Sequence, residues 1–84
     1  MISVGVQAAY ERIAEDMRSI WGEMALPMLR KRVRDVHAEP NAMTKQELEK
    51  IVDLLRSKTL PSILGDDGAE AKARQYVAWV ADSG

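Results

Sequence analysis

The chain has no cysteine, no phenylalanine and a single histidine among its 84 residues. Without cysteine it forms neither a disulfide nor a thiolate metal site, and it has no cysteine nucleophile. His37 has no second histidine to share a metal ion, and the nearby Asp35 and Glu39 would lie on different faces of a helix. We therefore expect no metal site.

Motifs that hold phosphate or calcium are also missing. The chain contains neither G-x-x-x-x-G-K-[ST] nor G-x-G-x-x-G, and "GDDGAE" lacks the pattern of a calcium loop. No serine stands in a G-x-S-x-G elbow. We expect no catalytic residue, no cofactor and no enzymatic activity. One further hypothesis stays open, a ligand held in the core near His37, because helical bundles bind ligands between facing helices.

Long hydrophobic runs are absent as well. No apolar stretch approaches the roughly 20 residues that cross a bilayer, and the first residues lack the basic and then apolar order of a signal peptide. A chain without cysteine fits a reducing compartment. We expect a soluble, cytoplasmic protein without a membrane partner.

A helical spacing of apolar residues is what the sequence does show. From Val6 onward, large apolar residues recur in alternating steps of four and three, which is the spacing of a helix with a narrow packing seam. The seam consists of Val6, Tyr10, Ile13, Met17, Ile20 and Met24. Gly22 and Pro27 interrupt this long first helix, so we predict a kink or break between them.

The remaining helices are marked by their ends. A second helix is expected to end before Pro40, and Thr44 with Glu47 forms a T-x-x-E capping box that opens a third. In "TLPSILG", Pro61 begins a short helical turn and Gly65 stops it.

The last helix is expected to start from a second capping pair, Asp67 with Glu70. Its buried face is predicted to comprise Ala69, Ala73, Tyr76, Val77 and Val80. The whole chain, 1–84, is then a single helical domain. We predict an all-α fold, a small bundle of four to five helices.

Charge is distributed unevenly along the chain. The net charge is -1, yet four of the twelve basic residues occupy five consecutive positions, as Arg30, Lys31, Arg32 and Arg34. On a helix, Arg30 and Arg34 share one face, with Lys31 beside Arg34 and Arg32 well round the helix. The core side carries Leu26, Leu29, Val33 and Val36. This pattern predicts an amphipathic helix with a basic outer surface.

Two functions follow from these features. The narrow seam predicts a protein-interaction or regulatory module that self-associates as a homodimer through its first helix. Alternatively, the basic helix contacts nucleic acid or another anionic partner through Arg30, Lys31, Arg32 and Arg34. Two simpler interpretations stay open: later helices of the same chain fill the seam, and the basic residues form an ordinary solvated face.

Overall fold

The computed structural model describes residues 4–39 and 42–82, and these are helical apart from short connections. The elements in chain order are α1 (Val4–Trp21), the 3-10 helix η1 (Gly22–Met24), α2 (Ala25–Asp35), α3 (Lys45–Leu54), the π-helix η2 (Leu55–Thr59) and α4 (Pro61–Ala81). No strand occurs in the described ranges. The predicted all-α class is confirmed.

The number of separate helices differs from the predicted four to five. The described residues form three continuous helical stretches, 4–35, 45–59 and 61–81. The reason is that η1 joins α1 to α2 without a loop, and that α4 continues across Gly65, so that the turn expected at Pro61 and the last helix form one stretch. No helix in the part of the chain that the structure describes is long and apolar enough to cross a membrane.

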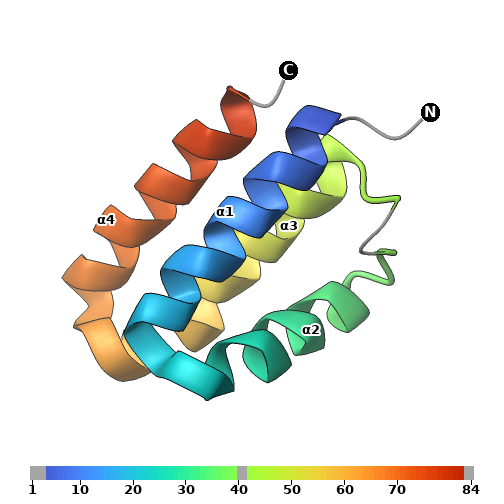
Figure 1. Ribbon diagram of the computed structural model, residues 1–84. Coiled ribbons are helices and arrows are strands. Elements are labelled where there is room, and N and C mark those ends of the chain that lie inside the picture. The colour runs from blue at the N-terminus through green and yellow to red at the C-terminus, as the bar shows by residue number, and fades with distance from the viewer. Residues whose placement is uncertain (1–3, 40–41, 83–84) are drawn as a thin grey trace.

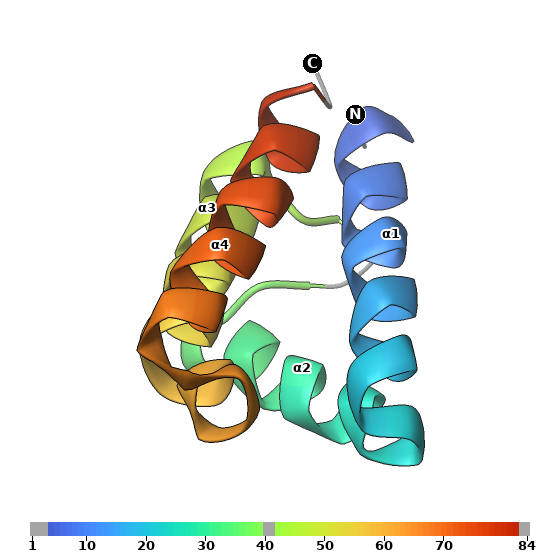
Figure 2. The same cartoon turned by 90° about the vertical axis from the view of Figure 1, so that its left-hand side faces the viewer.

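Three of the helices form the body of the bundle. In Figure 1, α1 and α3 run in the same direction and α4 runs back beside them. Figure 2 shows α2 crossing one end of this group, where it leaves the end of α1 at a steep angle. Since α2 packs on the others with its inner side only, its outer side lies on the surface.

The change of direction between α1 and α2 occurs at a glycine. Gly22 has a φ of 64°, a left-handed conformation that glycine adopts without steric cost. Pro27 lies in the first turn of α2, where a helix does not need the missing N–H group. The predicted interruption is therefore confirmed, and Gly22 makes the bend.

The start of α3 follows the predicted capping box. The Thr44 hydroxyl accepts a hydrogen bond from the Glu47 backbone N–H at 3.1 Å, and the Glu47 carboxylate accepts one from the Thr44 N–H at 2.9 Å. Two N–H groups that a helix start leaves unpaired are thus satisfied.

Two predictions for the last helix are wrong. Glu70 does not complete a capping box with Asp67, because its carboxylate accepts a hydrogen bond from Arg56 at 2.9 Å. Val77, which was expected to be buried, is 50% exposed. The predicted stop at Gly65 is confirmed, since this residue has a φ of 72° and a non-helical backbone inside α4.

A partly buried polar contact joins α1 to α4. Tyr76 is fully buried, and its hydroxyl donates a hydrogen bond to the Asp16 carboxylate at 2.7 Å. The Lys72 ammonium group lies 3.1 Å from the same carboxylate. Burial and the bond to Asp16 raise the pKa of Tyr76 far above its usual 10.0, so the hydroxyl keeps its proton.

We expect Tyr76→Phe to lower the free energy of unfolding by about 1–2 kcal/mol, because it removes a hydrogen bond to a charged group while keeping the ring. In wild type the unfolded chain ionises this tyrosine before the folded chain does, so stability is lost as pH rises above 10. The variant should lose less stability there. Urea unfolding at neutral and alkaline pH measures both effects.

The matched control is Tyr10→Phe. Tyr10 is half-buried, and no hydrogen bond of its hydroxyl is found in the described residues. It should change stability by less than about 0.5 kcal/mol at neutral pH. Equal losses in both variants would contradict the role given to the Asp16–Tyr76 bond.

Candidate interaction surface

Three cationic side chains occupy the outer face of α2. Arg30, Lys31 and Arg34 are all exposed, and none of them forms an ion pair within residues 4–39 and 42–82. The opposite side of the helix is buried through Leu29 and Val33. We refer to Arg30, Lys31 and Arg34 as the α2 basic face.

Arg32 does not belong to this face, although the sequence analysis included it among the candidate contacts to an anionic partner. Its guanidinium Nε donates a hydrogen bond to the Thr59 hydroxyl of η2 at 3.0 Å, and Nη1 donates one to Asp35 at 2.9 Å. The Arg32 side chain is only 14% exposed. Its role is to fasten α2 to η2, so it is not free to contact an anionic partner.

The π-helix explains why Thr59 is available for this bond. In η2, the Leu60 N–H donates to the Leu55 carbonyl five residues earlier, at 2.7 Å, which widens the last turn. Both Thr59 and Leu60 are buried. The Thr59 hydroxyl is therefore a buried polar group whose partner is supplied by α2.

An apolar hollow lies beside the α2 basic face. It has a volume of about 520 Å³. Its lining comprises Pro27, Arg30, Val33, Arg34, Ala38 and Glu39. The lining combines apolar side chains with two guanidinium groups and the single carboxylate of Glu39, so its net charge is positive. It is suited to a partner that offers an apolar side chain next to carboxylates.

The end of α2 builds one wall of this hollow. The Ala38 N–H donates to the Val33 carbonyl at 3.1 Å, and the His37 N–H donates to the Arg34 carbonyl at 3.0 Å. His37 has a φ of 56°, so the helix ends in a Schellman motif with His37 in the left-handed position. This motif places Ala38 against Val33. The sequence showed only that the helix stops before Pro40.

A second groove meets the first at Arg30. It lies between α1 and α2, has a volume of about 560 Å³, and is lined by Tyr10, Leu26 and Arg30 together with charged residues of α1. Burial raises the pKa of Tyr10, while the Arg30 charge opposes this shift. Arg30 therefore lines both hollows.

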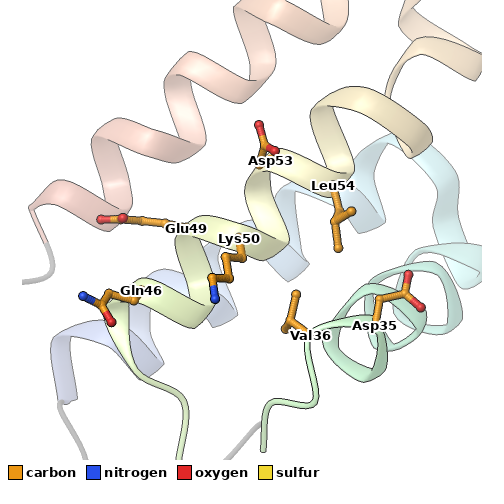
Figure 3. A pocket seen from close by; sticks show the side chains of 7 residues that line it. All are labelled: Asp35, Val36, Gln46, Glu49, Lys50, Asp53 and Leu54. Carbon is orange, nitrogen blue, oxygen red and sulfur yellow. The ribbon is translucent and has the colours of Figure 1, made fainter.

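The opposite flank of α2 forms a third hollow with α3. Figure 3 shows Val36 and Leu54 facing each other across it, with charged side chains around them. Its rim carries charges of both signs, from Asp35, Glu49, Lys50 and Asp53. Asp35 and Asp53 are already bound to Arg32 and Arg56, respectively, so this hollow selects less clearly for one charge than the basic face does.

The seam of the first helix is largely occupied by the chain itself. Val6, Ile13 and Met17 are buried in the core, where α3 and α4 pack against α1. Tyr10 and Ile20 are partly exposed, and only Met24 is highly exposed. In this fold, half of the predicted seam therefore faces the interior, because the remaining helices need that surface to build a core.

Within residues 4–39 and 42–82, the acidic side chains and His37 do not gather at one place. Among the described residues, no three His, Asp or Glu side chains are grouped so that they could hold a metal ion. His37 is exposed, while its neighbours Val36 and Ala38 pack against the core. Its imidazole therefore faces solvent in this structure.

Comparison with models of protein families, with curated proteins and with solved structures finds no match to this chain. Its function is accordingly argued from the geometry of its surface.

We expect Thr59→Val to lower the free energy of unfolding by about 1–3 kcal/mol, because it leaves the Nε–H group of Arg32 without its partner at a mostly buried position. Valine has nearly the shape of threonine, so the loss reports on the hydrogen bond. Thr59→Ser keeps the hydroxyl and should retain the bond. Denaturant unfolding compares the two, and a Thr59→Val protein as stable as wild type would disprove the fastening role of Arg32.

Proposed function

We propose that this chain is a small helical protein-interaction module that self-associates, and that its contact surface is the α2 basic face with the hollow beside it. The observation that carries the proposal is the exposure of Arg30, Lys31 and Arg34 without ion-pair partners in the described residues, next to an apolar hollow. Apolar area flanked by charges is typical of protein contacts. The lack of cysteine suits action in the cytoplasm.

The distribution of charge supports a second copy as the partner. Residues 26 to 38 carry a formal charge of +3, whereas the whole chain carries -1. Outside this segment, each copy is therefore negative and attracts the α2 basic face of another copy. The proposal moves self-association from the first-helix seam to α2, because Val6, Ile13 and Met17 are buried.

The proposal predicts that wild-type protein leaves a sizing column as a dimer or larger species, and that Arg30→Glu with Arg34→Glu leaves as a folded monomer. Reversing two charges at the contact turns attraction into repulsion, which should weaken association by at least about tenfold. Light scattering in low salt (about 50 mM) and moderate salt (about 300 mM) measures this, and association should be weaker in the higher salt.

The control is the double variant Lys58→Glu with Arg74→Glu, which changes net charge by the same amount at exposed positions outside α2. It should associate like wild type. A wild-type monomer up to millimolar concentration, or equal effects of the two double variants, would refute the proposal.

A second candidate function is nucleic-acid binding, which the same three unpaired cations favour. The slightly negative net charge and the lack of aromatic side chains within residues 26 to 38 make it the weaker candidate. We expect no binding of a labelled DNA duplex at about 50 mM salt, measured by fluorescence anisotropy. Binding that Arg30→Glu with Arg34→Glu abolishes would instead support the nucleic-acid function.

A further inference from the structure

A second exposed feature complements the α2 basic face in both charge and polarity. It lies where α4 begins and consists of Ile63, Asp66 and Asp67, which we call the α4 corner. Ile63 is 52% exposed and is one of three large hydrophobic side chains with high exposure among the described residues. Both aspartates are exposed, and neither forms an ion pair in those residues.

The backbone bends within this segment. Gly65 has a φ of 72° and a ψ of 175°, so the chain leaves helical geometry for one residue within α4, between Ile63 and the two aspartates. The corner stands at the end of the bundle where α1 passes into α2, as Figures 1 and 2 show.

The two surfaces match group by group. The α4 corner offers one apolar side chain and two carboxylates, whereas the α2 basic face offers three cations beside a hollow with an apolar floor. Guanidinium groups bind carboxylates through short, charge-assisted hydrogen bonds. Within one chain no ion pair joins the two surfaces, so both remain available to another molecule.

We propose that the α4 corner of one copy docks on the α2 basic face of a second copy, with Ile63 in the hollow lined by Pro27, Val33 and Ala38 and with Asp66 and Asp67 against Arg30 and Arg34. This inference rests on the proposed function, since it names the surface that the α2 basic face binds. The proposed function names only the α2 basic face; the inference adds the surface of the second copy that this face binds.

Charge exchange tests the pairing. Asp66→Lys with Asp67→Lys should weaken association as strongly as Arg30→Glu with Arg34→Glu, on the order of tenfold or more. Combining all four substitutions restores opposite charges across the contact and should recover most of the wild-type association. Light scattering and sedimentation over a range of concentrations give the dissociation constants.

The lysine substitutions at positions 66 and 67 also affect the stability of α4. Asp66 and Asp67 lie at the start of the helical part of α4 that follows Gly65, where negative charge is favourable and lysine costs stability. The neutral variants Asp66→Asn with Asp67→Asn avoid this cost and should still weaken association. Circular dichroism confirms folding of each variant, and Glu23→Lys with Glu49→Lys serves as the control with the same charge change at other exposed sites.

Substitution of Ile63 provides a second, independent test of the pairing. Ile63→Ser removes an exposed side chain, so the monomer should keep its stability, while association should weaken on the order of tenfold even in moderate salt because the lost contact is apolar. Ile63→Leu should associate like wild type.

The outcomes separate this inference from the proposed function. If Arg30→Glu with Arg34→Glu disrupts association while the Asp66, Asp67 and Ile63 variants do not, α2 is the contact and the α4 corner is not its partner. If association ignores the α2 variants or is absent in wild type, the proposed function fails. Recovery by the four-fold exchange supports the pairing, and its absence in a folded protein overturns it.

Discussion

The side chain of Arg32 fixes how α2 is turned about its own axis. Its guanidinium is held by the Thr59 hydroxyl at 3.0 Å and by Asp35 at 2.9 Å, so the flank of α2 that carries it stays against η2. Successive helical residues are rotated by about 100°, so holding one flank determines where the others point. Arg30, Lys31 and Arg34 then face outward. The outward orientation of the basic face thus depends on Arg32 together with the buried Leu29 and Val33.

The small size of the chain accounts for the fate of the first-helix seam. A domain of 84 residues has a large surface for its volume, so it needs nearly every regular apolar face for its own core. Ile13 and Met17 are accordingly fully buried beneath α3 and α4. A spacing that is suitable for pairing two helices is equally suitable for packing one helix on its neighbours. In this fold, the apolar side of α1 packs on helices of the same chain.

Local signals in the sequence predicted the fold better than they predicted the site. The signals that were confirmed act within a few residues of the chain. Thr44 and Glu47 form a capping box, and Gly22 and Gly65 adopt positive φ at the two bends. The role of Arg32 depends on Thr59, 27 residues away, and on the π-helical turn that buries it. Glu70 likewise binds Arg56 from another helix. Spacing along one helix cannot reveal a partner on another, and for that reason Arg32 was counted with Arg30, Lys31 and Arg34 as a contact to an anionic partner.

The proposed pairing of the α2 basic face with the α4 corner would determine the form of the assembly. Each copy carries one of each surface, so two copies can close a symmetric dimer only if both contacts form at once; otherwise the contacts continue from copy to copy. In a closed dimer the second contact forms within an existing complex, at high effective concentration, and the mass stops at two copies. In an open arrangement the mass keeps rising with concentration. The two surfaces lie on different elements, so their relative orientation within one copy decides between the forms. A closed dimer forms without rearrangement of either chain if the two surfaces of one copy face the two complementary surfaces of the other at the same time.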